Sequence, residues 1–588
     1  MKLSDYVIDY LHAQGTSHVF GMSGGAAVHL FDSASRHDAV TPVFMAHEQS
    51  AAMAADGYYR ASGRIGACVV TSGPGATNLL TGVCCSYYDS VPALMLTGQV
   101  ATGRLKGSRK VRQVGFQETE TTAIYASVTK SAVQIAKAAD IVPALESAYR
   151  IAQDQRPGPV LIDVPDDLQR ADLQVQRPVG ASVIDRSIDR DLPQQVAALL
   201  NKITLAKRPV LVVGGGFSTP RKSEELREFL SRVAVPVVQT WAGLDLLPSD
   251  WPHRIGTFGV YGSRLGNFTV QNADLLVCLG TRLSQNLTGG ALKDFAPGAE
   301  IVMVDIDRGE MDKFDGYGIE VSGRIEASMA DFLASATAAL ETFVMPDIDG
   351  WLAQIDYWQS EMPDDVPAEP ADSDGFVDAH RFVRKLSGVL AEDELIFVDT
   401  GGNLTWTCNN LLVKARQRVL SAWNFTPMGY ALPASIGGAF AAPGSSITCI
   451  IGDGGLQLCL GELATVVRHA LPIKIILFNN HSHGIQKQTL ETWLEGHYAG
   501  VDPASGLGLS HYPDVAKAMG LPVVTIDASS DIGERLEAVY RMPGPVFCNV
   551  EIRVDQKLHP VLKSGAPLDD QMPLMPREKL AALRLLKY

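Results

Sequence analysis

The stretch Ile447-Thr448-Cys449-Ile450-Ile451-Gly452-Asp453-Gly454 decides the fold, because an apolar run ends abruptly in two glycines around a carboxylate. A second apolar run, 473–478, ends in Asn479-Asn480, and apolar residues recur at helical spacing between Leu463 and Ala470. This pattern predicts strand, helix, strand, with a right-handed crossover between parallel neighbours. Both breaks then lie at the carboxyl edge of one sheet, where α/β proteins bind their ligands.

The side chains at these two breaks suit a divalent cation. Asp453 and the Asn480 amide supply the hard oxygen atoms that Mg²⁺ prefers and usually shares with a phosphate. Gly454 and Gly455 allow close approach of the backbone, and the helix beyond them offers free N–H groups to a diphosphate. The alternative is a glycine-rich turn in which Asp453 caps the helix.

Composition limits the classes of protein that remain. The chain has 588 residues and a formal net charge of −15, which argues against a broad nucleic-acid-binding face. The eight scattered cysteines contain no CxxC pair, so neither a disulfide framework nor a zinc site is indicated. The first residues, 1–15, suggest an amphipathic helix with Ser4 as a candidate cap, and no apolar run approaches a bilayer span. We expect a cytoplasmic protein without nucleic-acid or membrane partners.

Two proline-containing, charge-rich stretches, 173–192 and 345–375, divide the chain into three blocks. Each block alternates short Val/Ile/Leu runs with amphipathic stretches, which predicts three doubly wound parallel sheets of the α/β class. The domains we expect are an N-terminal domain at 1–175, a central domain at 190–345, a C-terminal domain at 376–560, and a tail at 561–588. The tail is either a lid over the cleft or a frayed end.

The first and third blocks resemble each other in two places. The segment 64–70 leads into Thr71-Ser72-Gly73-Pro74-Gly75 as 447–451 leads into Gly452-Asp453-Gly454, and the segment 157–164 (PGPVLIDV) is echoed by 543–550 (PGPVFCNV). An internal duplication explains this economically, with chance similarity of two α/β domains as the alternative. The central block is Rossmann-like, with a strand over 207–213 that ends in Gly214-Gly215-Gly216.

Glu48 is the candidate acid of the first block. It follows the apolar run 43–46 and precedes a helix of small residues, 50–57. A carboxyl group in such a place is desolvated, which favours its protonated form and suits it to share a proton with a neutral nitrogen base. The alternative is an acidic residue that the helix dipole favours at the start of a helix.

Taken together, these motifs resemble the thiamine diphosphate enzymes, and among them the acetolactate (acetohydroxyacid) synthase group. The resemblance runs through all three blocks in the family's order. It rests on Gly24-Gly25-Ala26, His47-Glu48-Gln49, 71–78 (TSGPGATN), 115–118 (GFQE), Met428-Gly429, Gly452-Asp453-Gly454 and Asn479-Asn480.

The resemblance implies roles for individual residues. Asp453, Asn480 and the backbone carbonyl of Ser482 would hold Mg²⁺ on the diphosphate, and Met428 would bend the cofactor. Glu48 would hydrogen-bond the pyrimidine ring and favour the imino tautomer that removes the C2 proton. The residues expected around the reacting carbon are Gly25, Phe116 and Gln117. The other expected contacts to thiamine diphosphate are Pro74, Asn78, Gly401, Gly402, Asn403, Gly452, Gly454, Gly455, Gly484 and Ile485.

The resemblance also suggests FAD in the central domain. The matching positions are Gly214, Gly215, Gly216, Thr240, Arg282, Asp305 and Glu310. Ser284 and Arg324 stand where that group usually has Asp, so some flavin contacts differ. Related decarboxylases keep this domain without a flavin, which leaves a purely structural domain as the alternative.

Since Glu48 and Asp453 belong to different blocks, the resemblance implies a site formed between two subunits. One chain would supply the acid and its neighbour the metal ligands. A homodimer, or a homotetramer made of two such dimers, is therefore expected.

The acceptor site departs from the synthase group. Asn286 and Thr489 stand where that group has an Arg and a Trp that shape the pocket for a second 2-keto acid. Near the diphosphate, Gly402 and Asn403 replace the expected Gln and His. Losing the guanidinium removes a carboxylate partner worth roughly 1.5–3 kcal/mol, and losing the indole widens the pocket.

We therefore predict a carboligase that decarboxylates pyruvate and transfers the two-carbon hydroxyethyl/acetyl unit to a ketone, keto sugar or 2-keto acid. It resembles the acetolactate synthase-like enzymes that build branched-chain sugars. The alternatives are ordinary acetolactate synthesis, simple decarboxylation, oxidation to acetyl phosphate, and a non-catalytic thiamine diphosphate-binding protein. A nicotinamide oxidoreductase is weaker, because no glycine-rich turn has GxGxxG spacing.

Overall fold

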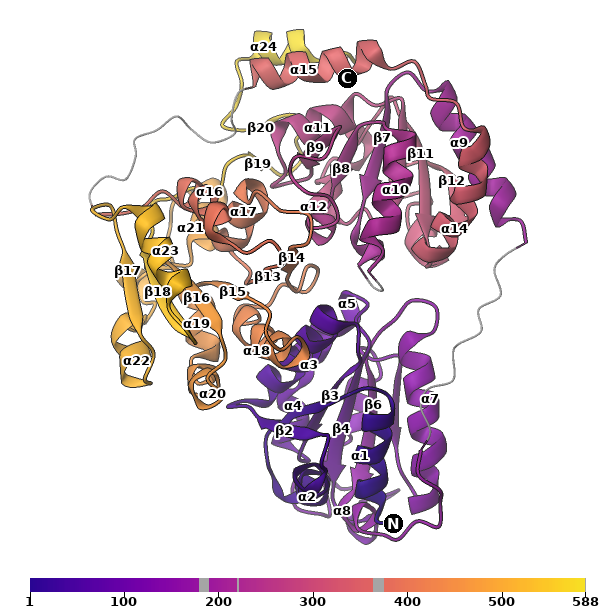
Figure 1. Cartoon of the computed structure of the whole chain (residues 1–588), viewed down its shortest axis with the longest axis vertical. Helices are drawn as coiled ribbons and strands as arrows, with labels where there is room; N and C mark the ends of the chain where they lie inside the picture. Colours follow the sequence, from indigo (N-terminus) through magenta and orange to yellow (C-terminus); the bar gives the residue numbers. More distant parts are fainter. Residues whose placement is uncertain (179–189, 219–220, 363–374, 587–588) are drawn as a thin grey trace.

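The computed structural model describes residues 1–178, 190–218, 221–362 and 375–586. Much of each predicted boundary stretch, namely 179–189 and 363–374, lies outside these residues. The described chain forms three six-stranded parallel sheets flanked by helices, which confirms the predicted α/β class (Figure 1). A separate two-stranded antiparallel sheet lies near the C-terminus.

The first sheet has the strand order β2-β1-β3-β4-β6-β5. Its central strands β3, β4 and β6 are buried along their whole length, as near-continuous apolar runs covered on both faces require. Its strands are β1 (His18–Gly21), β2 (Thr41–Phe44), β3 (Gly66–Val70), β4 (Ala93–Gln99), β5 (Ser131–Gln134) and β6 (Val160–Pro165). Its helices are α1 (Leu3–Ala13), α2 (Val28–Arg36), α3 (Glu48–Ser62), α4 (Pro74–Asn78), α5 (Leu80–Tyr88), α6 (Thr121–Tyr125), α7 (Ile141–Gln153) and α8 (Asp166–Gln169).

The third sheet repeats the topology of the first. Its order is β14-β13-β15-β16-β18-β17, so in both sheets the strands lie second, first, third, fourth, sixth, fifth, as an internal duplication predicts. Its strands are β13 (Leu395–Val398), β14 (Arg418–Leu420), β15 (Ile447–Gly452), β16 (Ile473–Asn479), β17 (Val523–Ile526) and β18 (Val546–Glu551). Its helices are α16 (Ala379–Val389), α17 (Gly402–Asn410), α18 (Ala431–Ala441), α19 (Asp453–Cys459), α20 (Glu462–Arg468), α21 (Gly484–Trp493), α22 (Tyr512–Ala518) and α23 (Ile532–Arg541).

The middle sheet has a different order, β12-β11-β10-β7-β8-β9. Counted from its own first strand this is 6-5-4-1-2-3, the Rossmann arrangement, with the switch point between β7 and β10. Its strands are β7 (Pro209–Val213), β8 (Val237–Gln239), β9 (Arg254–Thr257), β10 (Leu275–Leu279), β11 (Glu300–Asp305) and β12 (Val321–Glu326). Its helices are α9 (Leu192–Leu205), α10 (Ser223–Val233), α11 (Arg264–Gln271), α12 (Gln285–Thr288), α13 (Arg308–Asp312), α14 (Met329–Ala339) and α15 (Asp349–Glu361).

Helix α15 lies within the second stretch, 345–375, that we took to divide the blocks. Trp351, Ile355 and Trp358 are spaced about one turn apart and bury one face of α15 in the core of the middle domain. This helix therefore belongs to the middle domain.

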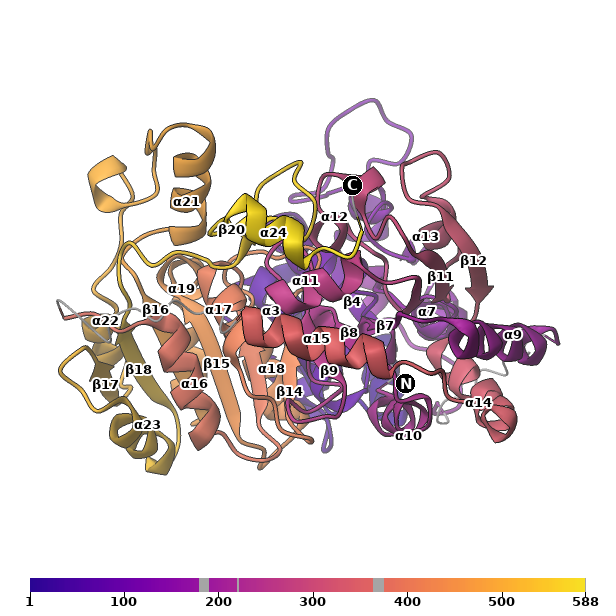
Figure 2. The same cartoon turned by 90° about the horizontal axis from the view of Figure 1, so that it is seen from above.

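The C-terminal tail also packs on the middle domain and is not frayed over its described residues (Figures 1 and 2). It contains β19 (Val561–Leu562), β20 (Gln571–Met572) and α24 (Arg577–Leu583). Leu568 and Leu580 are buried in the middle core, and the Trp358 indole N–H donates to the Leu583 carbonyl at 3.0 Å. A role for the tail as a lid stays a prediction.

The first and third domains share one core, formed where α3 crosses α18. At Gly57 a Cβ atom would lie 2.1 Å from the Ala434 carbonyl oxygen, and at Gly437 one would lie 1.9 Å from that of Ala54. Only glycine permits such close approach of two helices. The Tyr430 hydroxyl donates to Asp56 at 2.5 Å across the same interface. This contact fixes the two ligand-binding edges relative to each other within one chain.

Local expectations differ from the structure in three details. Ser4 lies inside α1 and bonds the Ser33 hydroxyl at 2.9 Å, so it is not a cap. Two helices, α19 and α20, fill the crossover predicted as one, and Ala470 falls beyond them in the left-handed region at φ 48°. All eight cysteines are buried and free. No helix among the described residues has the length and apolar character to cross a bilayer.

Candidate active site

The structure brings the predicted metal ligands together at the carboxyl edge of the third sheet. β15 and β16 pair in parallel, so Asp453 and Asn480 follow neighbouring strand ends. The Asp453 side chain, in a residue 2 % exposed, accepts the N–H groups of Gly454 at 2.7 Å and Ser482 at 3.1 Å. Burial raises the pKa of the Asp453 carboxyl to about 6. A buried carboxylate that two N–H groups hold in place is a fixed anionic ligand.

The neighbouring groups fit a cation at this edge. The Asn480 side-chain NH₂ donates to the Ser482 hydroxyl at 3.1 Å, which leaves its amide oxygen to accept or to coordinate. At Gly484 an added Cβ would lie 2.5 Å from the same NH₂. No cluster of three or more His, Cys, Asp or Glu side chains occurs among the residues that the structure describes. The set therefore resembles Mg²⁺ sites, in which substrate or cofactor phosphate completes the coordination.

The glycines around this edge let neighbouring groups approach the backbone closely. At Gly454 an added Cβ would approach the His483 ring to 2.6 Å and the Met428 methyl to 3.4 Å, which places both side chains against α19. Gly452 faces the Asn403 amide oxygen, and Gly401 is in the left-handed region at φ 104°.

Asp399, which the sequence reasoning missed, organises the same region. Its carboxylate accepts the N–H groups of Gly429 at 3.1 Å and Ala431 at 2.9 Å, and burial raises its pKa to about 7. Asn403 donates its amide to the Asp399 carbonyl at 2.7 Å. The carboxylate therefore holds the turn that presents Met428. Its position at the end of a short apolar run, 395–398, was the available signal.

Glu48 lies at the corresponding edge of the first sheet. It is the first residue of α3 and only 7 % exposed, and His47 caps the helix by accepting the Gln49 N–H at 3.1 Å. The Asn78 amide donates to Glu48 Oε2 at 3.0 Å, and an added Cβ at Gly75 would lie 3.4 Å from Oε1. Glu48 is thus both the first residue of a helix and buried. It can therefore interact favourably with the helix dipole and also share a proton with a ligand.

The other predicted residues of the first block follow the strands β1, β3 and β4. Gln117 has φ 63° and packs against Gly73, whose added Cβ would meet the Gln117 Cβ at 2.9 Å. Pro74 begins α4, and at Gly25 an added Cβ would meet no atom within 4 Å. Phe116 is 82 % exposed, which is unusual for a ring of its size.

The predicted residues thus form two groups on two separate sheets. The acid group comprises Glu48, Pro74, Asn78 and Gln117, and the metal group comprises Asp453, Asn480, Ser482 and Met428. Helix α21, which begins at Gly484-Ile485 beside the metal group, has no buried residue.

Comparison with known proteins agrees with this arrangement. Three family models match the three domains in order, described as the thiamine pyrophosphate enzyme N-terminal TPP-binding domain over residues 1–124, the central domain over 196–332 and the C-terminal TPP-binding domain over 399–550. A probable acetolactate synthase large subunit of Methanocaldococcus jannaschii is 33 % identical, over 97 % of this chain and 94 % of that protein. The chain belongs to the thiamine diphosphate enzymes of the acetolactate synthase family.

Other relatives support the same assignment. The large subunit of acetolactate synthase isozyme 1 of Escherichia coli is 30 % identical, over 96 % of each chain. The acetolactate synthase large subunit of Lactococcus lactis is 29 % identical, over 97 % of this chain and 96 % of the relative. The protein is therefore a thiamine diphosphate-dependent enzyme of acetolactate synthase type.

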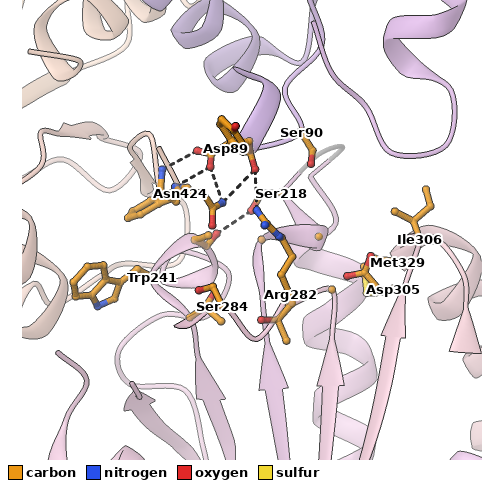
Figure 3. Close-up of a pocket in the computed structure, with 18 of the residues that line it drawn as sticks. Asp89, Ser90, Ser218, Trp241, Arg282, Ser284, Asp305, Ile306, Met329 and Asn424 are labelled. Carbon is orange, nitrogen blue, oxygen red and sulfur yellow. Dashed lines mark hydrogen bonds between the residues drawn. The ribbon is translucent and has the colours of Figure 1, made fainter. Parts of the chain in front are cut away.

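A large cavity opens at the switch point of the middle sheet (Figure 3). The volume of this cavity is about 250 Å³. Of the residues predicted to contact FAD, Gly215, Gly216, Thr240, Arg282 and Asp305 line it. Gly214 and Glu310 do not belong to the lining. The Thr240 hydroxyl is buried without a hydrogen-bond partner among the described residues, which leaves a polar atom for a ligand.

Ion pairs inside the protein explain why Glu310 stands apart. Its carboxylate lies 2.8 Å from Arg156, 2.8 Å from Arg282 and 2.7 Å from Lys313. Burial alone would raise its pKa, but the hydrogen bonds from Lys313 and Arg156 lower the pKa of Glu310 to about 2. Glu310 therefore anchors cations that border the cavity, and a direct contact between Glu310 and a flavin stays a prediction.

The other domains close this cavity with residues that sequence reasoning missed. Asp89 of the first domain accepts the backbone N–H groups of Trp423 at 2.7 Å and Asn424 at 3.0 Å, and all three line the cavity (Figure 3). Arg60 pairs with Asp89 at 2.8 Å. The contacts of Asp89 with Trp423 and Asn424 join residues more than three hundred positions apart, so no local sequence pattern predicts them. The sequence offered one indication that Trp423 lies near a ligand site, namely that it precedes Met428 by a few residues.

Proposed function

We propose that the enzyme is a carboligase that decarboxylates pyruvate and joins the remaining two-carbon unit to a second carbonyl compound. The C1–C2 bond of pyruvate breaks and CO₂ leaves, C2 bonds to the acceptor's carbonyl carbon, and the acceptor's oxygen takes up a proton to become a hydroxyl. Thiamine diphosphate supplies the electron sink for this exchange. The protein supplies position, a dry site and proton transfer.

The observation that carries the proposal is the buried Glu48 carboxyl, fixed at 3.0 Å by Asn78 at the edge of the first sheet. A binding protein needs no desolvated acid in contact with its cofactor, whereas an enzyme that must move a proton at a ring nitrogen does. This counts against the alternative of a non-catalytic thiamine diphosphate-binding protein.

Asp453, Asn480 and the Ser482 carbonyl are the residues that would hold Mg²⁺, and the glycines at 452, 454 and 455 give the diphosphate access to the start of α19. Gly401, Gly402 and Asn403 flank the same edge. Met428, against Gly454, would contact the cofactor.

The acid group and the metal group would meet across two chains, in a homodimer or in a tetramer of two such dimers. Helix α21 supports this arrangement, because it has no buried residue and ends with Trp493 and Leu494 more than half exposed. Exposed apolar side chains of this size beside a ligand site are typical of surfaces that a partner covers.

FAD is the proposed occupant of the switch-point cavity. The unpartnered Thr240 hydroxyl, the close approach that Gly215 and Gly216 allow, and Asp305 at the end of β11 support it. Arg324, at a position where the group usually has Asp, pairs with Asp312 and Asp315 instead.

We expect the purified enzyme to carry FAD, because a cavity with an unsatisfied hydroxyl gains stability when a ligand fills it. Acid release followed by chromatography should give close to one FAD per chain, and FAD should raise the melting temperature of the stripped protein. A colourless, fully active preparation that ignores added FAD would leave the central domain as a purely structural one.

The acceptor is proposed to be a ketone or keto sugar bulkier than pyruvate. Asn286 stands where the family has Arg, and the Thr489 hydroxyl donates to the Ile485 carbonyl at 3.0 Å. Neither side chain offers a guanidinium to the carboxylate of a second 2-keto acid. Ordinary acetolactate synthesis is the second candidate, which the names of the relatives favour.

Product analysis separates these candidates. With Mg²⁺ and thiamine diphosphate present, we expect pyruvate alone to yield acetolactate slowly, and an added ketone to accelerate pyruvate consumption at least about tenfold, since one charge-assisted contact is absent for the second pyruvate. Rapid acetolactate formation that no ketone accelerates would establish ordinary synthase activity. Acetaldehyde as the main product would indicate simple decarboxylation.

A further inference from the structure

A basic loop leads directly into the candidate active site. Between β4 and Gly115, residues 101–114 contain five Lys or Arg and no Asp or Glu, in a chain whose formal net charge is −15. The loop projects from the first domain as the violet segment at the top of Figure 2. Such a local reversal of charge marks a place where an anion is attracted.

The base of the loop is fixed to the site. The buried Glu118 carboxylate accepts the N–H groups of Lys106 at 2.5 Å, Val114 at 2.7 Å and Gly115 at 3.3 Å. Burial alone would raise the pKa of Glu118, but these hydrogen bonds lower this pKa below its usual value. One carboxylate therefore ties both ends of the loop to Gly115, two positions before Gln117. The charges of the loop are held beside the residues expected around the reacting carbon.

Three of the basic side chains are available to a ligand. Arg104, Lys110 and Arg112 are exposed, and no carboxylate among the described residues pairs with them. By contrast, Lys106 pairs with Glu120 at 2.9 Å, and Arg109 donates to the carbonyls of Leu105 and Lys106. Fixed positive charges without internal partners interact most strongly with a multiply charged anion.

We propose that residues 104–112 bind a phosphate ester on the acceptor, so that the second substrate is a phosphorylated keto compound. This inference rests on the proposed carboligase function. The acceptor pocket lacks the Arg that would hold a carboxylate next to the reacting carbonyl, while the unpaired cations lie on a loop beyond it. The acceptor's charge is therefore remote from its carbonyl, as in a sugar monophosphate or a nucleoside diphosphate sugar.

A matched pair of acceptors tests the inference. With pyruvate as donor, kcat/KM is measured for dihydroxyacetone and for dihydroxyacetone phosphate. We expect the phosphate to improve kcat/KM at least about tenfold, mainly through KM, because charge-assisted contacts of this kind give about 10- to 100-fold. The advantage should shrink between 20 and 300 mM salt on the order of severalfold, because salt screens exposed charges.

The triple variant Arg104→Gln, Lys110→Gln, Arg112→Gln should lose this preference. KM for dihydroxyacetone phosphate should rise about tenfold relative to KM for dihydroxyacetone. The control is Arg150→Gln, Lys207→Gln, Arg535→Gln, which removes three exposed cations away from the loop and should keep the wild-type ratio. Methyl phosphate and uridine diphosphate, as competing ligands, distinguish a monoester site from a nucleotide site by which of them inhibits at lower concentration.

The outcomes separate this inference from the function on which it rests. Equal use of both acceptors by wild type, or an unchanged ratio in the loop variant, overturns the phosphate proposal while carboligation stands. A loop variant that changes the oligomeric state and keeps the ratio also overturns it and assigns the loop to subunit contact. If neither acceptor is used and pyruvate alone is consumed rapidly, the carboligase proposal fails first.

Discussion

Glu48→Gln is expected to abolish most turnover while leaving the fold and cofactor binding intact. The amide preserves the size of the side chain, and its oxygen still accepts the Asn78 N–H that Glu48 Oε2 accepts at 3.0 Å. It cannot share a proton with a ring nitrogen as a carboxyl group does. Proton transfer by a positioned group contributes about 10²- to 10⁴-fold, so we expect CO₂ release from pyruvate to fall at least about 100-fold.

Control measurements must show that Glu48→Gln loses proton transfer without losing cofactor binding or stability. Thiamine diphosphate affinity, from quenching of protein fluorescence, and the melting temperature should both stay near wild type. Glu537→Gln, a fully comparable change at an exposed position of α23, should leave turnover unchanged. Wild-type decarboxylation by Glu48→Gln would refute the role given to this acid.

Particular residues show how far the sequence predicts this site. Asp453 and Asn480 were predictable because each follows an apolar strand, and the crossover rule makes those strands parallel neighbours, as β15 and β16 are. The glycine run after the first strand of the central block predicted a Rossmann-like domain, and in the structure Gly215 and Gly216 line the cavity at the edge of that sheet.

Long-range contacts explain the failures. Asp89 holds Trp423 and Asn424 across a domain boundary, and a pairing of that separation leaves no local signature. Helix α15 was hidden because the chain around it is rich in proline and charge, although Trp351 and Trp358 mark its buried face. The flavin contact of Glu310 stays a prediction, and no local pattern indicated that Arg156 and Lys313 would pair with its carboxylate.

Asp453→Ala is expected to uncouple thiamine diphosphate binding from Mg²⁺. The Asp453 carboxylate is fixed by the N–H groups of Gly454 and Ser482, so it is preorganised as a ligand. Loss of a residue that merely orients a metal ligand costs about 10- to 100-fold in affinity, so loss of the ligand itself should cost at least about 100-fold. Titration of the cofactor at several Mg²⁺ concentrations measures this. Asp393→Ala, an exposed change in the same domain, is the control.

Combining the two variants tests whether one site draws on two chains. Glu48→Gln and Asp453→Ala homodimers should each be nearly inactive. A hybrid dimer has two active sites. One site carries both substitutions, and the other carries wild-type Glu48 from one chain and wild-type Asp453 from its partner. Random co-assembly should therefore restore about one quarter of wild-type activity, because half of the dimers are hybrids with one working site of two. If each site lay within a single chain, every site would keep one defect and the mixture would stay inactive. That result, or a monomeric active enzyme, would contradict the shared site.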